Sequence, residues 1–249
     1  MHLTRSMSPA ERDRLMQAHL AQARGPVRNG DLLRSAVARA ITRHGQGRQT
    51  GPQGEAMTSD PLIETLSFVV SALEAAGIRY AITGSTASSV HGEPYSSVDV
   101  DLIVLATSTA AAKLAAALAP RFYAPADVLS GAATRGEFAH VVDNHTSLKV
   151  DLSFIGSGPQ HAFLQQALAR RVRARIGSHP VEFWLVTPED VILMKLLWRK
   201  DTGSAKQWEN AVSVARVKGA RMDWKYLFEQ ARTLGIEPDL VTHRDEAGI

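Results

Sequence analysis

The chain has 249 residues, of which 45% are hydrophobic, enough for one large domain or two small ones with a sizeable core. It contains no cysteine, which excludes disulfides, thiolate metal sites and a cysteine nucleophile, and no apolar run approaches the length of a transmembrane helix. A cytoplasmic protein without a membrane partner is therefore expected.

The positive charge is concentrated near the N-terminus. Residues 1–56 contain nine arginines and four acidic residues, a net charge of +5, whereas residues 57–249 contain 19 basic and 21 acidic groups, a net charge of −2. The pI of about 9.3 comes from this N-terminal segment. It does not indicate nucleic-acid binding by the remainder of the chain.

Residues 1–59 predict a basic, partly helical extension and linker. Ser8-Pro9-Ala10-Glu11 has the composition of a helix start, with a Ser cap and Pro in the first turn. Residues 44–59 are rich in Gly, Gln, Thr and Pro and have little to bury, as in a linker. Met57 offers an alternative start of translation.

Residues 60–186 predict an α/β core. Asp60-Pro61 opens a helix that Gly77 ends. In chain order we then expect a strand at 79–83, a short helix at 85–91, a strand at 98–105, a helix at 109–118, paired strands at 138–142 and 147–154, a helix at 160–169, and a hairpin of strands at 171–176 and 181–186.

Residues 187–249 predict a helical C-terminal unit. Thr187-Pro188-Glu189-Asp190 is a strong helix start, and the helix continues through residues 191–198 with Lys195 as almost its only polar residue. Two more helices are expected near residues 206–218 and 223–234.

Two carboxylates share one face of the strand at 98–105. Asp99 and Asp101 are two residues apart and so project together, with Val100 behind them. Lys149 and Asp151 share a face of a strand expected to lie nearby. Because such carboxylates repel one another, they favour a cation between them, and oxygen ligands alone favour Mg²⁺ or Mn²⁺. Asp151 would complete that site or take a proton from an attacking hydroxyl.

Gly84-Ser85 predicts a phosphate-binding helix start. Glycine permits a tight turn and close approach of the backbone, and the helix beginning at Ser85 offers unpaired N–H groups and a positive dipole end. Lys149 would steady a phosphate or moderate the carboxylate cluster. Ser85 as a simple helix cap, and Lys149 as a solubilising residue on an edge strand, remain the plainer alternatives.

These motifs together resemble the DNA polymerase β-type nucleotidyltransferase superfamily. The pattern is a hydrophobic residue, Gly84-Ser85, a spacer of residues 86–98, then Asp99-Val100-Asp101-Leu102, with Asp151 on a later apolar strand. Residues 80–94 and 187–196 narrow the resemblance to small stand-alone bacterial nucleotidyltransferases related to abortive-infection and toxin-type enzymes. It covers about residues 60–240.

The resemblance implies a short mixed sheet flanked by helices, with the helical C-terminal part closing over the nucleotide. It implies transfer of a nucleoside monophosphate from a nucleoside triphosphate such as ATP, with release of pyrophosphate. In toxin-type relatives the acceptor is the tRNA 3′ end, the enzyme is paired with an antitoxin protein, and a lysine at the place of Lys195 takes part. Small molecules are acceptors for other members of the superfamily.

The chain departs from the family pattern at Tyr95, where relatives often have a basic residue, and at Asn210, where they commonly have an acid. Each departure removes a charge near the site. A nucleotide-binding module without turnover is therefore the alternative function.

A second basic motif lies at Arg170, Arg171, Arg173 and Arg175, on the first strand of the expected hairpin. A solvated hairpin face is the plainer interpretation, and contact with RNA or phosphate is the sharper one.

Overall fold

The computed structural model describes residues 60–94, 99–176 and 181–249. The predicted extension, Met57, Tyr95 and the turn at Gly177-Ser178 lie outside these ranges. No helix in the described part is both long and apolar enough to cross a membrane.

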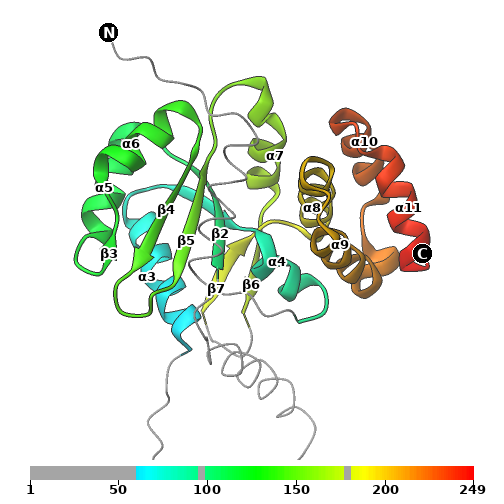
Figure 1. Ribbon diagram of the computed structural model, residues 1–249, viewed down its shortest axis with the longest axis horizontal. Helices are drawn as coiled ribbons and strands as arrows, with labels where there is room; N and C mark the ends of the chain where they lie inside the picture. Colours follow the sequence, from blue (N-terminus) through cyan, green and yellow to red (C-terminus); the bar gives the residue numbers. More distant parts are fainter. Residues whose placement is uncertain (1–59, 95–98, 177–180) are drawn as a thin grey trace, which may run out of the picture.

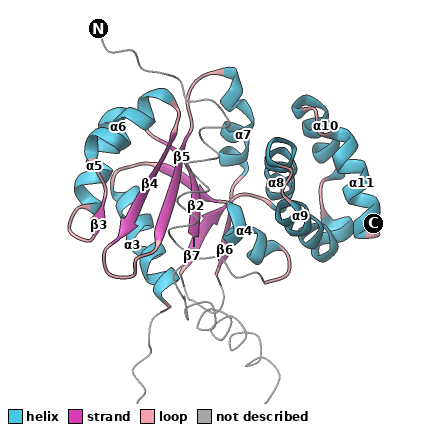
Figure 2. Ribbon diagram, in the orientation of Figure 1, coloured by secondary structure: helices cyan, strands magenta, loops and turns pink. Residues whose placement is uncertain are grey.

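A mixed sheet of seven strands forms the centre of the molecule, in the order β3-β4-β5-β2-β1-β7-β6 (Figure 2). The strands are β1 (Arg79–Ile82), β2 (Asp99–Leu105), β3 (Phe122–Tyr123), β4 (Phe138–Asp143), β5 (Lys149–Phe154), β6 (Val172–Arg175) and β7 (Glu182–Leu185). β2 pairs in parallel with β5, and β1 with β7, whereas the other neighbours are antiparallel. The expected mixed sheet is therefore confirmed.

Five helices lie around the sheet, and four more follow it in the chain (Figure 1). The first group is α3 (Pro61–Ala75), α4 (Gly84–His91), α5 (Ser108–Leu118), α6 (Ala126–Arg135) and α7 (Ala162–Arg170). The second is α8 (Pro188–Thr202), α9 (Ala205–Lys218), α10 (Trp224–Leu234) and α11 (Glu237–Ala247). Short 3-10 turns occur at Pro159–His161 and Gly219–Arg221.

The side chains on one face of β2 are buried in the hydrophobic core. Val100, Leu102 and Val104 are fully buried, whereas Asp99 and Asp101, which alternate with them, are only partly buried. This alternation is what a strand with one apolar face produces, and it leaves the two carboxylates on the opposite face.

The helical unit α8–α11 packs beside the sheet through α4, which contacts both α8 and α9 (Figure 1). The start of α8 is held by a buried network around Asp190. Tyr226 of α10 donates a hydrogen bond to Asp190 at 2.6 Å, and Thr187 donates another at 2.8 Å. Arg170 of α7 lies 3.5 Å from Asp190 and stacks 3.6 Å from the Tyr226 ring centre. Residues 187–190, which predict a helix start, thus also join three helices.

The predicted elements of the core agree with the observed ones to within a few residues, including the antiparallel hairpin of β6 and β7. β3, α6 and α11 were not predicted. β3 has only two residues, and α6 includes Ser130, Gly131 and Thr134 with no cap hydrogen bond at Pro125. In α6 these turn-forming residues obscure the helical spacing of Leu129, Ala132 and Ala133. α11 has Pro and acidic residues in its first turn but buries only Leu240 and His243, so it shows little apolar period.

Candidate active site

The parallel pairing of β2 and β5 brings the predicted acidic residues together. Asp99 lies opposite Lys149, and Asp101 lies opposite Asp151. Residues paired in this way project from the same face of a sheet. Four of the predicted site residues therefore share one face, although the two strands are far apart in the sequence.

Gly84 lies directly against the Asp101 side chain. Its φ is +62°, a left-handed conformation that L side chains rarely adopt. A Cβ added to Gly84 would overlap the Asp101 carboxylate and would lie 2.8 Å from the Asp101 Cβ. In addition, the amide of Thr83 donates to the Asp101 carbonyl at 2.9 Å. Glycine is therefore required here for both its backbone conformation and its lack of a side chain.

The N-terminus of α4 is left without a side-chain cap. Thr83 is the N-cap residue, but its side chain makes no capping hydrogen bond, and its hydroxyl donates instead to the Met194 sulfur at 3.0 Å. By contrast, Asp60, Thr107 and Thr187 cap their own helices. The first backbone N–H groups of α4, including that of the buried Ser85, are thus available to an anion next to Asp101.

Burial and mutual repulsion disfavour the ionised forms of the carboxylates. Burial, followed by the charges of Asp151 and Asp99, raises the pKa of Asp101, while Lys195 opposes that shift. Burial also raises the pKa of Asp151, against the opposing effect of Lys149. A cation placed between these groups would relieve the repulsion.

An ammonium group already contacts Asp151. Lys149 Nζ lies 2.9 Å from Asp151 Oδ2, whereas Asp151 Oδ1 is buried without a hydrogen-bond partner in the described part of the chain. No group of three or more His, Cys, Asp or Glu within the described ranges is arranged so that it could hold a metal ion. Carboxylate oxygens are the ligands that Mg²⁺ and Mn²⁺ prefer, so the residue types of the site fit these ions. However, one carboxylate oxygen of Asp151, Oδ2, is paired with Lys149.

Lys195 reaches the carboxylates from α8. It is buried, and burial lowers its pKa to about 8, against the opposing charge of Asp101 and with the help of the nearby charge of Lys206. A lysine whose burial is compensated mainly by one carboxylate is suited to receive a second negative group.

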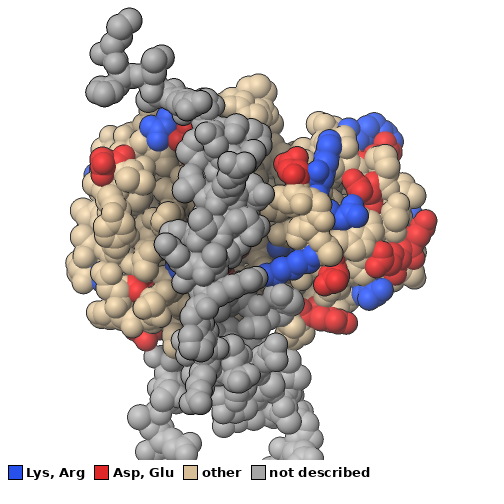
Figure 3. All heavy atoms as spheres, viewed as in Figure 1, with Lys and Arg blue, Asp and Glu red and all other residues tan. Residues whose placement is uncertain are grey.

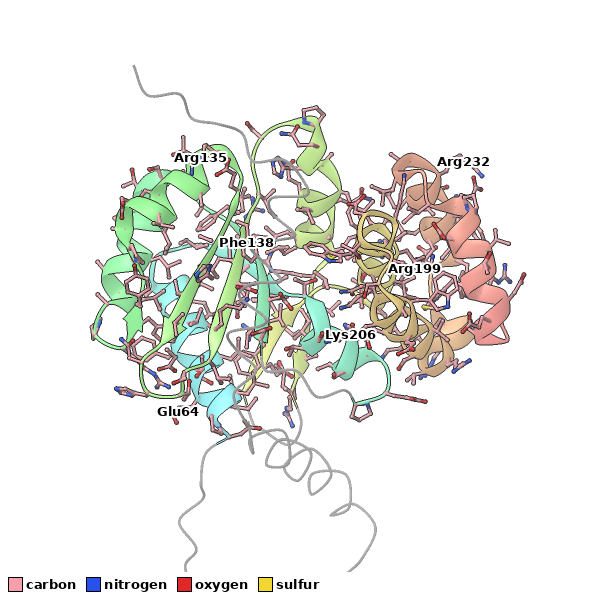
Figure 4. All side chains as sticks on the ribbon, viewed as in Figure 1. Glu64, Arg135, Phe138, Arg199, Lys206 and Arg232 are labelled. Carbon is pink, nitrogen blue, oxygen red and sulfur yellow. The ribbon has the colours of Figure 1, made fainter. Side chains whose placement is uncertain are left out.

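Two further residues lie near the site without having been singled out in the sequence. Lys206, near the start of α9, lies where α9 faces α4 (Figure 4), and its charge acts on Lys195. His140 of β4 lies opposite Asp151 on the side away from β2. Neither belongs to a motif, so only the pairing of β4 with β5 and the packing of α9 on α4 reveal them.

Three other residues lie in structural positions, and two of them, Arg170 and Asn210, belong to motifs of the sequence. His91 donates through Nε2 to the Val186 carbonyl at 2.8 Å, and burial lowers its pKa, so it joins α4 to the end of β7 as a neutral ring. Arg170 belongs to the network around Asp190. Asn210 is buried on α9 with its amide nitrogen unpartnered among the described residues.

No protein-family model and no curated protein matches the chain. Among solved structures, it is similar to an antigenic nucleotidyltransferase-like protein from Paracoccidioides brasiliensis, with 18% identity over 76% of this chain and 94% of that one and a TM-score of 0.44. It is also similar to the antibiotic-resistance factor ANT(2″)-Ia in solution, with 13% identity, 73% and 97% coverage and a TM-score of 0.48.

A crystal structure of ANT(2″)-Ia in complex with adenylyl-2″-tobramycin is similar to the chain as well, with 12% identity, 70% and 98% coverage and a TM-score of 0.47. The solved structures to which the chain is similar thus include a nucleotidyltransferase-like protein and ANT(2″)-Ia.

Proposed function

We propose that the protein transfers a nucleoside monophosphate from a nucleoside triphosphate to an acceptor, with the help of a divalent metal ion. The observation that carries this proposal is the register of β2 and β5, which sets Asp101 opposite Asp151, beside the uncapped start of α4. Carboxylates that could bind a metal ion therefore lie next to backbone N–H groups that could bind phosphate.

The triphosphate would lie against the start of α4. Gly84 allows the backbone to approach it, and the N–H groups and hydroxyl of Ser85 would bind phosphate oxygens. Lys195, which is buried near Asp101, would add a positive charge. The helix dipole and this ammonium both favour the charge of the phosphates.

Asp99 and Asp101 would hold Mg²⁺ or Mn²⁺, with Asp151 as a third ligand or as the general base. The metal ion, when bound, neutralises charge on the triphosphate and on the departing pyrophosphate. In the transfer, the acceptor oxygen forms a bond to the α-phosphorus while the bond from that phosphorus to the pyrophosphate oxygen breaks. The acceptor proton passes to Asp151.

Lys149 controls whether Asp151 is available. Its ammonium lies 2.9 Å from Asp151 Oδ2. We propose that triphosphate binding draws Lys149 toward the phosphates and releases that oxygen. If Lys149 instead stays on Asp151, the same site would bind a nucleotide without turnover, which is the second candidate function and the one that the Lys149–Asp151 pair favours.

The acceptor is proposed to be tRNA or a small hydroxyl-bearing molecule. The test uses all four nucleoside triphosphates labelled on the α-phosphate, with Mg²⁺ or Mn²⁺, and total tRNA or an aminoglycoside such as tobramycin as acceptors. Label should appear in one acceptor class, and pyrophosphate should be released in equal amount. A toxin role would appear as slowed growth on induced expression, relieved by Asp101→Asn.

Asp101→Asn is the decisive variant, and Asp127→Asn, an exposed carboxylate on α6, is its matched control. Transfer should be lost in the first and kept in the second. Transfer that survives Asp101→Asn would remove the basis of the proposal. Metal-dependent nucleotide binding in calorimetry, without pyrophosphate release from any acceptor, would instead establish the binding module.

A further inference from the structure

Three arginines gather where β1, β7 and β6 lie side by side in the sheet. We call Arg79, Arg171 and Arg173 the arginine cluster. Arg79 opens β1 and lies opposite Leu105, the last residue of β2, whereas Asp99 is the first residue of β2. The four-residue step from Asp101 to Leu105 spans about 13 Å of extended strand. Arg79 is therefore separate from the proposed triphosphate site along the strand, whereas Arg171 and Arg173 are separate from it across the sheet, because β6 is the third strand from β2.

Two members of the cluster stack on one indole ring. The guanidinium carbons of Arg171 and Arg173 lie 4.6 and 4.9 Å from the centre of a Trp184 ring, and Arg173 is directly opposite Trp184 in the pairing of β6 with β7. Stacking leaves the N–H edge of each guanidinium in its own plane. There Arg171 Nη1 donates to the Leu168 carbonyl at 2.9 Å and Arg173 Nη1 to the Glu182 carbonyl at 3.3 Å, so an anion would bind the remaining N–H groups.

No carboxylate in the described part of the chain forms an ion pair with the cluster. Five other arginines each form an ion pair, namely Arg121, Arg135, Arg170, Arg199 and Arg232. Four more have none among the described residues, as in the cluster: Arg175, Arg216, Arg221 and Arg244. The buried Nε of Arg171 has no hydrogen-bond partner among the described residues. Burial, followed by the charge of Arg79, lowers the pKa of Arg171. The cluster thus forms no ion pair among the described residues, although the Glu74 carboxylate lines a cavity together with Arg79 and Arg171.

Space for a ligand adjoins the cluster. Arg79 lines a cavity of about 410 Å³ whose polar lining includes Thr134, Ser157 and Gln165. It also lines a second cavity of about 260 Å³, together with Arg171 and Trp184. Glu74 lines this second cavity too, but its carboxylate accepts the hydroxyl of Tyr80 at 3.3 Å.

Protection of a sheet edge explains part of this arrangement. β6 is an edge strand, and charged side chains on an edge prevent pairing with another chain. That accounts for Arg173, which is exposed on β6. It does not account for Arg79, because β1 lies between β2 and β7, or for the partly buried Arg171 without an acidic partner.

The helical unit does not present a comparable surface on the face seen in Figure 3. Over α8–α11, basic and acidic side chains lie side by side on that face. Mixed charges of this kind produce little long-range attraction for a polyanion. The arginine cluster differs from that face in its excess of positive charge, because its three arginines lie near one cavity-lining carboxylate, that of Glu74.

We propose that the arginine cluster binds the phosphate backbone of a nucleic acid. The planar guanidinium fork matches two phosphate oxygens, and arginine with a neighbouring aromatic ring suits a nucleic-acid strand. The binding itself does not depend on the proposed function. A second step rests on that function: the bound nucleic acid would be the acceptor, and the cluster would hold a part of it that lies away from the end that receives the nucleotide.

The test measures binding of the full chain to labelled tRNA, without nucleotide and with EDTA present, between about 50 and 200 mM salt. Arg79→Gln combined with Arg171→Gln should weaken binding about 10-fold to 100-fold. It should also reduce the slope of log affinity against log salt by about 1.5, since each lost phosphate contact removes roughly 0.7–0.9. Single-stranded DNA of matched length tells whether the ribose contributes.

The matched control is Arg135→Gln combined with Arg232→Gln, which removes two charges from exposed, ion-paired arginines. It should leave affinity and slope nearly unchanged, and the basic residues 1–56 contribute equally to both double variants. Equal losses in the two double variants, no loss in the cluster variant, or displacement of tRNA by poly-glutamate as readily as by RNA would each overturn the proposal.

Two further variants separate loss of tRNA binding from loss of folding and from loss of transfer. Arg79→Gln alone changes an exposed side chain and should already reduce the salt slope by about 0.7 with an unchanged unfolding midpoint. Asp101→Asn should abolish transfer while tRNA binding stays intact. If Asp101→Asn retains transfer, the proposed function fails without affecting the cluster, whereas failure of the cluster variants leaves the transfer experiment unaffected.

Discussion

The carboxylate of Asp101 occupies the space into which a side chain on Gly84 would project. The two residues come from β2 and from the start of α4, and their contact fixes the distance between the carboxylates and the free end of that helix. Any side chain at residue 84 must therefore move one of the two parts of the site.

Gly84→Ala should abolish nucleotide binding and transfer. The substitution adds backbone strain of about 1–2 kcal/mol at a positive φ and also forces the Asp101 side chain to move. Gly77→Ala is the matched control, because Gly77 has φ +66° but nothing within 4 Å of an added Cβ. In urea unfolding both variants should lose stability, whereas calorimetry should show loss of nucleotide binding only for Gly84→Ala.

The charge on Lys195 should set an upper pH limit for activity. Its pKa of about 8 means that it loses its proton as the pH rises through that value. Above it, kcat/KM should fall about tenfold per pH unit, because a neutral amine no longer attracts phosphate. Lys195→Arg stays charged and should show no such fall. An identical pH profile in this variant would assign the fall to another group.

The same pKa predicts the opposite trend for stability. Folding lowers the pKa of Lys195 from 10.5 to about 8, so between these values the unfolded chain binds more protons than the folded one. This residue should therefore make the free energy of unfolding rise with pH across that window. Chemical unfolding of the wild type and Lys195→Met at pH 8 and above compares the two slopes, and the variant should have the smaller one.

The buried pair of Arg121 and Asp143 should stabilise the fold more than any surface pair. Although burial opposes it, hydrogen bonds from Arg121 at 2.6 Å and Thr65 at 2.7 Å hold the pKa of Asp143 well below its usual range. Asp143→Asn leaves Arg121 without this partner and should cost about 3–5 kcal/mol in urea unfolding. Glu137→Gln, which breaks an exposed pair with Arg135, should cost no more than about 1 kcal/mol.

The pH dependence of this pair has a definite sign. The folded-state pKa of Asp143 lies below the unfolded value of 3.8, so its contribution is present above that value and is lost as the pH falls toward the folded pKa. Acid unfolding of Asp143→Asn should lack this component. If both proteins lose stability equally below about pH 4, the pair is not its source.

Tyr226→Phe should loosen the attachment of α10 to α8. It removes the 2.6 Å hydrogen bond to Asp190 and leaves that buried carboxylate with one partner fewer, which should cost about 1–3 kcal/mol. Tyr123→Phe is the control, since Tyr123 is 62% exposed, and should stay within about 0.5 kcal/mol of wild type. Thermal unfolding followed by circular dichroism gives both values, and equal midpoints would contradict this role.

The local part of the site could be predicted from the sequence. Asp99 and Asp101 alternate with buried residues, and Gly84 interrupts an apolar run, so their shared face and the turn follow from periodicity and glycine chemistry alone. The shared face of Lys149 and Asp151 follows for the same reason. This prediction requires only that the two residues of each pair are two positions apart on a strand.

The non-local part could not be predicted in detail. The ion pair between Lys149 and Asp151, the nearness of Lys206 to Lys195, and the position of His140 beside Asp151 depend on which strands and helices become neighbours. α6 was missed although Leu129, Ala132 and Ala133 follow helical spacing, because its Ser, Gly and Thr residues are typical of turns. The arginine cluster shows the same limit, because the sequence reveals Arg171 and Arg173 but not that Arg79 joins them across the sheet.

The pairing of β2 with β5 also makes the site a reporter of correct folding. Residues 106–148 separate the two strands, so their contact closes a long loop and has a high sequence separation. A slip of one residue would turn Asp151 to the opposite face, away from Asp101. Partly folded or misregistered chains would then have no competent site, so the fraction of molecules that bind nucleotide measures the fraction with this strand alignment.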